Sequence, residues 1–275
     1  MKIAVTGGTG FIGNHLITHL LNEGHDVLVT GTNEEKAKVY EWYSKVEFVK
    51  LNINSTISQD KLQEIARCQK LIHLAWNGLP NYKELFHFEL NLMPQYNFLK
   101  NLVELGMEDL TVAGTCMEYG LQNGCLTVDS PVDPQNSYAI AKDTLRRFLV
   151  QLQTKKNFNL KWVRLFYMYG KGQSDKSILS QLDRALDNGD DAFNMSGGEQ
   201  LRDYLPVEKV AENISRLCTE QYSTGIYNCS SGIPISVRTL VEMHLKRRNK
   251  TTKLNLGFYP YSDFEAMAFW GENNI

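Results

Sequence analysis

A short apolar strand runs directly into three glycines at the start of the chain. Residues 2–6 read Lys-Ile-Ala-Val-Thr, and Gly7, Gly10 and Gly13 follow at intervals of three residues, where a helical pattern over 11–22 begins. In such a turn the first glycine permits the tight bend, the second lets a pyrophosphate approach the backbone, and the third lets the helix pack on the strand. The helix N-terminus then presents free N–H groups to the phosphates. The spacing predicts a dinucleotide-binding turn, and the alternative is a glycine-rich loop without a ligand.

Apolar runs alternate with amphipathic stretches along most of the chain, which is typical of βαβ units that build a parallel sheet. We therefore expect an α/β fold with a doubly wound parallel sheet formed by 1–166 plus 206–231, in which 206–220 and 225–229 return to the sheet. A smaller, discontinuous substrate lobe is expected from 167–205 plus 232–275. The expected strands cover 2–6, 26–30, 46–50, 70–75, 109–114 and 160–166, and the expected helices cover 11–22, 33–42, 58–67, 82–105 and 137–154.

Composition narrows the class of protein. A formal charge of −2 over 275 residues gives no electrostatic reason to expect nucleic acid as a partner. Five cysteines, odd in number and never spaced as C-x-x-C, argue against a disulfide framework and against a zinc site. We therefore expect no metal, and a reducing, cytoplasmic location. No apolar run reaches the about 18 residues of a membrane span, and the first strand leaves no room for a signal peptide.

A tyrosine and a lysine lie four residues apart in the expected helix 137–154. Tyr138 and Lys142 therefore share one face of that helix, where the ammonium would lower the pKa of the phenol and make it a general acid or base. Thr115 follows the strand 109–114, at the carboxyl end where doubly wound sheets bind ligands. Its hydroxyl could hold a substrate oxygen beside Tyr138. The alternatives are an ordinary surface pair and a strand-end hydroxyl that bonds its own backbone.

Together these motifs resemble the extended short-chain dehydrogenase/reductases that act on nucleotide sugars, over most of the chain. The resemblance implies a Rossmann-type fold and a catalytic triad of Thr115, Tyr138 and Lys142. It also implies that Arg202 binds the diphosphate of the nucleotide sugar, and the alternative is an ion pair with Asp203. Further motifs that carry the resemblance are Ile72-His73-Leu74-Ala75, Asn91, Pro134 with Ser137, Arg164-Leu165-Phe166, Tyr169-Gly170, Arg202-Asp203-Tyr204 and Tyr227-Asn228.

The same resemblance assigns most of the predicted site. The residues expected at the cofactor are Gly7, Thr9, Gly10, Phe11, Ile12, Gly13, Thr32, Lys36, Asn52, Ile53, Leu74, Ala75, Asn91, Tyr138, Lys142 and Phe166. The residues expected at the substrate are Trp76, Cys116, Met117, Tyr167 and Arg202. The aromatic residues at 258–261 and 269–270 are expected to belong to the core rather than to contact a ligand.

The residues after Thr115 separate the members of this family. Dehydratases of the group carry an Asp-Glu pair there, but this chain has Cys116 and Met117. Glu118 is displaced by one residue, which on an extended chain turns it to the opposite side. In the epimerase-reductases that make GDP-fucose, the cysteine stands two residues after the hydroxyl, where this chain has Met117. A 4,6-dehydratase is therefore not expected, and Cys116 is interpreted as a pocket or packing residue.

The end of the second strand bears on the choice of cofactor. NAD-dependent relatives hold an acidic residue there, whereas this strand ends in Gly31, followed by Thr32 and, further on, Lys36. A carboxylate would repel a 2′-phosphate, so its absence predicts NADPH in preference to NADH. The alternative is that Thr32 and Glu35 form a capping box and the lysine is solvated. Asn52 stands where the family usually has an aspartate near the adenine.

These expectations lead to one interpretation and its rivals. The chain is expected to reduce the C4 ketone of a nucleoside-diphosphate 4-keto-6-deoxyhexose, with dTDP, CDP or GDP left open, for the synthesis of surface polysaccharide such as O-antigen. The alternatives are an NAD-dependent nucleotide-sugar 4-epimerase and a non-catalytic NADP-binding protein. A homodimer is expected because many relatives form a four-helix bundle, here from helices 82–105 and 137–154.

Overall fold

The computed structural model describes residues 1–261 and 265–275. Its centre is a seven-stranded sheet in which every neighbouring pair of strands is parallel. The strand order runs outward in both directions from β1 and β4, so the sheet is doubly wound. The predicted α/β, Rossmann-type fold is thereby confirmed. In spatial order the strands are β11 (Gly225–Cys229), β7 (Asn159–Leu165), β5 (Asp109–Thr115), β4 (Lys70–His73), β1 (Lys2–Thr6), β2 (Asp26–Gly31) and β3 (Glu47–Lys50).

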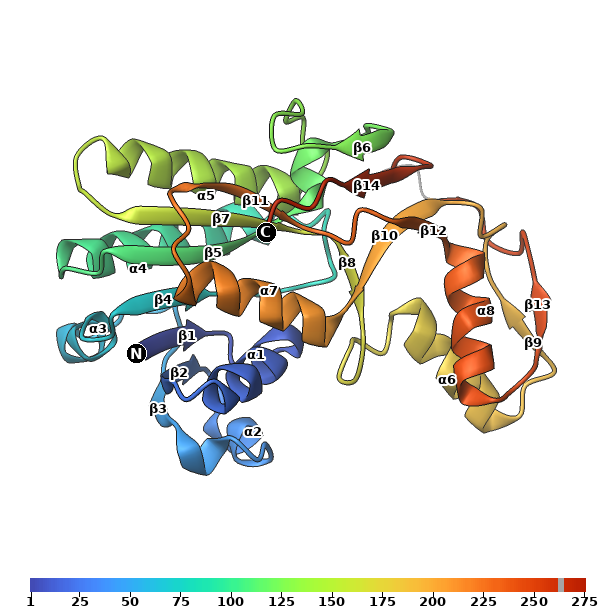
Figure 1. Ribbon diagram of the computed structural model, residues 1–275, viewed down its shortest axis with the longest axis horizontal. Coiled ribbons are helices and arrows are strands. Elements are labelled where there is room, and N and C mark those ends of the chain that lie inside the picture. Colours follow the sequence, from blue (N-terminus) through green and yellow to red (C-terminus); the bar gives the residue numbers. More distant parts are fainter. Residues whose placement is uncertain (262–264) are drawn as a thin grey trace.

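Helices cover both faces of this sheet (Figure 1). On one face α1 and α7 pack against β1 and β2, with Leu16, Ile17 and Ile214 in a common buried cluster. On the other face α3, α4 and α5 pack through residues such as Phe98 and Leu149. Because both faces are buried, the middles of the strands are largely apolar, as in Ile3, Ala4 and Val5 of β1. The helices of this part are α1 (Phe11–Asn22), α2 (Glu34–Lys38), α3 (Gln59–Ala66), α4 (Met93–Glu104), α5 (Ser137–Gln153) and α7 (Val207–Thr219).

The remaining strands form smaller sheets, most of them at the right of Figure 1. There α6 and α8 enclose a separate apolar cluster that includes Leu182 and Val241. The end of the chain returns toward the large sheet, where the Asn274 side chain accepts a hydrogen bond from the Asn228 N–H at 2.7 Å. The exact division into two lobes stays a prediction. The elements outside the large sheet are β6 (Gly124–Leu126), β8 (Tyr167–Tyr169), α6 (Ile178–Asn188), β9 (Ala192–Asn194), β10 (Leu201–Pro206), β12 (Pro234–Ser236), α8 (Val237–Arg248), β13 (Lys253–Asn255) and β14 (Phe269–Gly271).

Two helices differ from the prediction. The expected helix over 82–105 is a π-helical segment, His87–Leu92, followed by α4. Pro94 lies in the first turn of α4 and has no N–H to donate to the preceding turn, so the regular hydrogen-bond ladder is interrupted there. The helix expected over 33–42 is the short α2. Its cap is the Asn33 side chain, which accepts from the Lys36 N–H, so the alternative capping box of Thr32 and Glu35 is not formed.

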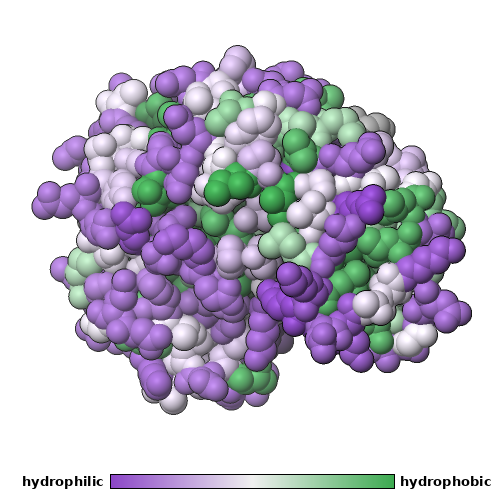
Figure 2. All heavy atoms as spheres, turned by 45° about the vertical axis from the view of Figure 1, so that its right-hand side comes forward, coloured by the Kyte–Doolittle hydropathy of each residue, from purple (hydrophilic) through white to green (hydrophobic). Residues whose placement is uncertain are grey.

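The aromatic residues near the C-terminus divide between core and surface. Phe269 is buried in a cluster with Phe166, as predicted. Phe258 and Tyr259 are 56% and 52% exposed, so the prediction that they belong to the core is wrong. They follow β13, which pairs with β9 in a sheet of two strands among the described residues. Figure 2 shows hydrophobic side chains among the exposed atoms on the side that carries α6 and α8.

All five cysteines are free thiols. No cluster of three or more His, Cys, Asp or Glu side chains that could hold a metal ion occurs within 1–261 and 265–275. In the same part of the chain, no helix has both the length and the apolar character needed to cross a membrane.

Candidate active site

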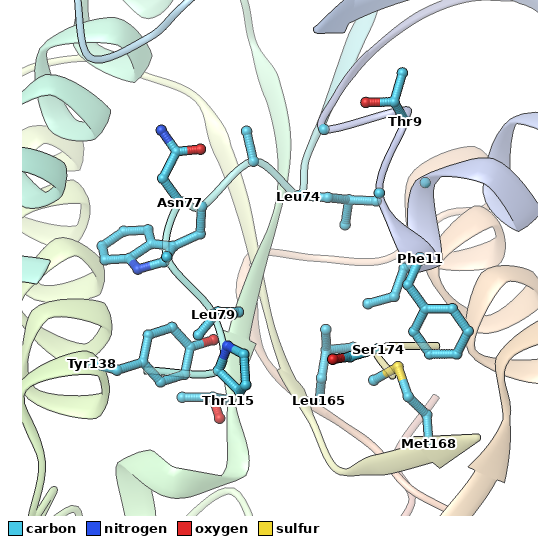
Figure 3. A pocket seen from close by; sticks show the side chains of 18 of the residues that line it. Thr9, Phe11, Leu74, Asn77, Leu79, Thr115, Tyr138, Leu165, Met168 and Ser174 are labelled. Carbon is cyan, nitrogen blue, oxygen red and sulfur yellow. The ribbon is translucent and has the colours of Figure 1, made fainter. Parts of the chain in front are cut away.

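A cavity of about 760 Å³ opens at the carboxyl ends of the central strands and extends from the glycine turn to Tyr138. In Figure 3, Thr9 and Phe11 line one side, and Thr115 and Tyr138 line the other. Most of the residues predicted for the site line this one cavity: Gly7, Thr9, Gly10, Phe11, Ile12, Gly13, Thr32, Lys36, Asn52, Ile53, Leu74, Ala75, Trp76, Thr115, Cys116, Met117, Tyr138, Phe166 and Tyr167.

The glycine turn leaves no room for side chains. Gly7 has φ of +73°, and a Cβ on it would lie 2.9 Å from the backbone nitrogen of Ala75. A Cβ on Gly13 would lie 2.3 Å from the carbonyl oxygen of Gly7. Gly10 is the N-cap of α1 and offers no side chain to its free N–H groups. The positive end of α1 therefore faces the cavity, and this set of groups fits the diphosphate of a dinucleotide.

Beside the glycine turn, Lys36 is the one charged side chain among the described residues of the cavity wall. Gly31 ends β2, and Thr32 and Lys36 follow on the cavity wall. The Lys36 ammonium makes no ion pair within the described residues, whereas the neighbouring Lys38 is paired with Glu35 at 2.7 Å. An exposed cation that lines the cavity and lacks a counter-ion can bind a phosphate there.

Thr115 occupies the predicted position at the end of β5, where the chain turns into a short 3₁₀ helix, Cys116–Tyr119. Its hydroxyl accepts from the Met117 N–H, and Glu118 accepts from the Thr115 N–H at 2.9 Å. We expected Glu118 to lie on an extended chain, but it lies in this 3₁₀ helix. Its side chain is fully buried in an ion pair with Arg164 at 2.8 Å. It is not part of the cavity wall.

Tyr138 extends from the first turn of α5, with its hydroxyl toward the cavity (Figure 3). Burial raises the pKa of this phenol, and a hydrogen bond with Thr115 acts in the opposite direction. The expectation that Lys142 acidifies the phenol is therefore wrong in this arrangement, because burial dominates. Burial also lowers the pKa of Lys142 to about 8, against the opposing charge of Glu118. The Lys142 ammonium lies 4.4 Å from the ring centre of Trp76.

Arg202 is not on the cavity wall and is only 2% exposed. Its guanidinium donates to the Glu265 carboxylate at 3.1 Å and to two backbone carbonyl groups. The alternative ion pair with Asp203 is not formed, because that carboxylate accepts from the N–H groups of residues 231 and 232. Glu265 also accepts from the hydroxyl of Tyr167, which lines the cavity. Arg202 is thus linked to the cavity through Glu265 and Tyr167.

Asn91 and Lys142 are the other predicted residues that do not line the cavity. Asn91 is buried, and its side chain bonds the Asn54 amide and the carbonyl of Asn77. Residues that the sequence reasoning missed include the loop 77–80 and the segment 172–174. The loop follows β4 and contains Gly78 and Pro80, so the rule that ligands bind at strand ends could have found it. The other missed residues of the wall are Thr30, Gly31, Leu51, Tyr82, Gln95, Gly114, Leu165 and Met168.

Comparison with known proteins gives consistent findings. A dTDP-6-deoxy-L-talose 4-dehydrogenase (NAD(+)) from Aggregatibacter actinomycetemcomitans is 31% identical over 272 residues, which is 98% of this chain and 99% of that protein. A GDP-6-deoxy-D-talose 4-dehydrogenase from the same organism is 24% identical over 97% of this chain and 87% of its own length. The structure of MoeE5 in complex with UDP-glucuronic acid and NAD superposes with a TM-score of 0.83 at 22% identity, covering 100% of this chain and 90% of that one. Residues 3–230 match the model of the NAD dependent epimerase/dehydratase family, and the chain belongs to that family of nucleotide-sugar enzymes.

Proposed function

We propose that this protein is a nucleotide-sugar 4-ketoreductase, which reduces the C4 ketone of a nucleoside-diphosphate 4-keto-6-deoxyhexose. The observation that carries the proposal is the chemistry of the cavity wall. Among the described residues on that wall there is no aspartate, glutamate or histidine. Elimination of water needs a base to remove one proton and an acid to protonate the departing hydroxyl. A wall that offers phenol and hydroxyl groups but no carboxylate suits the transfer of one proton with one hydride.

Each residue of the predicted triad has a role in this reaction. Tyr138 donates a proton to the oxygen that develops negative charge at C4, and its raised pKa keeps the phenol protonated and ready to donate. Thr115 offers a hydroxyl hydrogen bond to the same oxygen and lies close enough to bond Tyr138. Lys142 does not line the cavity, and its ammonium acts on that developing charge through its positive field. The bound nicotinamide supplies the hydride.

The similarity to two 4-dehydrogenases supports the position of the reaction on the sugar. Both are named for the oxidation of a 6-deoxytalose at C4. Oxidation at C4 and reduction of the C4 ketone are the same reaction in opposite directions. We therefore propose a 6-deoxytalose or its C4 epimer as the product, made in the cytoplasm for surface polysaccharide such as O-antigen, with a dTDP-linked substrate as the first to test.

We also propose NADPH as the preferred reductant. Support comes from the cavity wall, where Gly31 stands in place of a carboxylate and Lys36 makes no ion pair with any residue that the structure describes. The relative with NAD(+) in its name points the other way. Direct titration of both cofactors therefore belongs in the first experiment.

A homodimer is proposed as the assembly. Exposed apolar side chains lie on the outer surface of α5 and near the start of α4, including Ile140, Val150, Leu90 and Met93. Surfaces of this kind are covered when two helices of each subunit form a bundle. Sedimentation equilibrium should give twice the mass of the chain.

The experiment that tests the function offers NADPH and NADH separately with dTDP-4-keto-6-deoxyhexoses and follows the oxidation of the cofactor. One cofactor consumed for each ketone reduced is expected. Tyr138→Phe should abolish turnover and leave cofactor binding intact, and undiminished turnover would overturn the proposed role. A change of configuration at C4 without net consumption of cofactor would instead show a 4-epimerase.

A further inference from the structure

Trp76 follows β4 closely and contributes its indole to the cavity wall. It contacts both members of the predicted tyrosine and lysine pair. The Lys142 ammonium lies 4.4 Å from its ring centre, and the ring of Tyr138 meets it edge to face at a centroid distance of 6.0 Å. One side chain outside the triad thus lies against two of its three members.

The orientation of this indole is held by a hydrogen bond. Its Nε1–H donates to Nδ1 of His87 at 3.0 Å, and Nε2 of His87 is 3.0 Å from the carbonyl oxygen of Asn81. Both bonds form together only if the imidazole is neutral with its proton on Nε2. His87 is fully buried, and burial lowers its pKa, which keeps it neutral near pH 7. The indole of Trp76 is therefore held by an imidazole that stays neutral near pH 7.

Lys142 depends on aromatic faces because it has no anionic partner in contact. Within the described residues its ammonium makes no hydrogen bond or ion pair, and its close contacts are the faces of Trp76 and, at 5.7 Å, Trp162. A buried cation without a partner is costly, and an indole face is the aromatic surface that stabilises a cation best. The titratable groups around it are His73 of β4, His87 of the π-helical segment, Glu118 of the 3₁₀ helix and Tyr138 on its own helix.

We propose that Trp76 is a positioning residue, whose indole, fixed by His87, holds the Lys142 ammonium charged and beside Tyr138 through a cation–π contact. The consequence for turnover rests on the reductase function proposed above. The contact itself does not depend on that function. The two can therefore be tested separately.

The first test is nuclear magnetic resonance of the protein with ¹³C-labelled lysine side chains and no substrate. The Lys142 signal is assigned by its loss in Lys142→Met. In the unmodified protein we expect its methylene protons next to the ammonium to be shifted upfield by the ring current of the indole. Trp76→Leu should remove that shift and lower the titration midpoint of Lys142 by about 0.5–1 pH unit, because an apolar side chain remains but the aromatic face is gone. Trp76→Phe should preserve most of both.

Two matched variants isolate the hydrogen bond and the effect of losing an indole elsewhere. His87→Asn keeps an acceptor near the position of Nδ1 and should resemble the unmodified protein, while His87→Phe should reduce the ring-current shift. Trp270→Leu removes an indole that is not on the cavity wall and should change neither quantity. A folded Trp76→Leu protein with an unchanged Lys142 shift and midpoint would overturn the proposal.

The second test is the pH dependence of kcat/KM. The alkaline limb should move to lower pH in Trp76→Leu by the amount seen in the titration, and Trp76→Phe should restore it. An equal loss of activity at every pH, with the limb unmoved, would mean that the indole only fills space and would refute the positioning role. If the unmodified protein shows no reductase activity, the reductase proposal fails while the resonance experiment still decides this one.

Discussion

Replacement of Glu118 by glutamine should destabilise the fold far more than its conservative chemistry suggests. Glu118 Oε2 accepts from Arg164 Nε at 2.8 Å, and both side chains are fully buried. The two terminal nitrogens of Arg164 are buried without a hydrogen-bond partner in the described structure. Among the described residues Glu118 is the anion paired with this guanidinium, whose other close contact is the ring of Tyr119 at 4.3 Å. Glu118→Gln keeps an oxygen for the Thr115 N–H but leaves the arginine charge uncompensated.

The expected magnitude follows from burial. Removing one partner of a buried ion pair costs about 3–5 kcal/mol. That is a large share of the about 5–15 kcal/mol that stabilises a typical domain. The matched control is Glu47→Gln, which breaks the Lys2–Glu47 pair at 2.7 Å with side chains 35% and 59% exposed. Exposed ion pairs contribute at most about 1 kcal/mol. The two ion pairs have almost the same N–O distance, so the comparison isolates the effect of burial.

The assay is urea unfolding followed by circular dichroism, with the free energy of unfolding compared among the variants. A second variant pair, Glu118→Gln with Arg164→Met, should recover much of the loss because no charge is then left unpaired. If Glu118→Gln and Glu47→Gln lost similar amounts, or if the double variant were as unstable as the single one, the reasoning from burial would be refuted.

Three further outcomes are expected. Lys36→Met should weaken NADPH binding several-fold and leave NADH binding unchanged, while Lys38→Met changes neither, as measured by fluorescence titration. Glu265→Gln should leave the buried Arg202 guanidinium without its carboxylate partner and lower the free energy of unfolding in the same urea assay; unchanged stability would contradict this. Burial lowers the pKa of His73 to about 3, so the folded state favours the neutral imidazole. The unfolded chain binds a proton at this histidine below about pH 6.5, so the folded state loses stability as the pH falls below that value. His73→Gln should flatten this decline in unfolding experiments.

The large sheet could be predicted because its signals are local. Each central strand is a mainly apolar run that ends at turn residues, and the glycine turn indicates the first β–α connection. Those same local signals placed Thr115 at a strand end and Tyr138 in the first turn of α5. Thr115 and Tyr138, which follow from these local signals, therefore both line the cavity.

Contacts between distant segments could not be predicted in this way. Arg202 meets Glu265, 63 residues further along the chain, and nothing near either residue indicates that pairing. The contact of Lys142 with Trp76 depends on how α5 packs beside the loop after β4. Spacing along one helix indicated that Lys142 and Tyr138 share a face. The contact of Trp76 with both side chains was not predicted.

The neutral groups at the reacting end of the cavity determine how the proposed reduction and its reverse should depend on pH. Burial raises the pKa values of Tyr138 and of the Cys116 thiol, so both are protonated near neutral pH. Reduction uses the phenol in the form in which it stands, because the developing alkoxide takes a proton. Oxidation of the 6-deoxy sugar needs the phenolate, which forms only as the pH rises. Initial rates in both directions between about pH 6 and 9 should therefore show oxidation rising steeply with pH and reduction flat or falling. Parallel profiles for the two directions would show that Tyr138 does not enter the reaction as a neutral phenol.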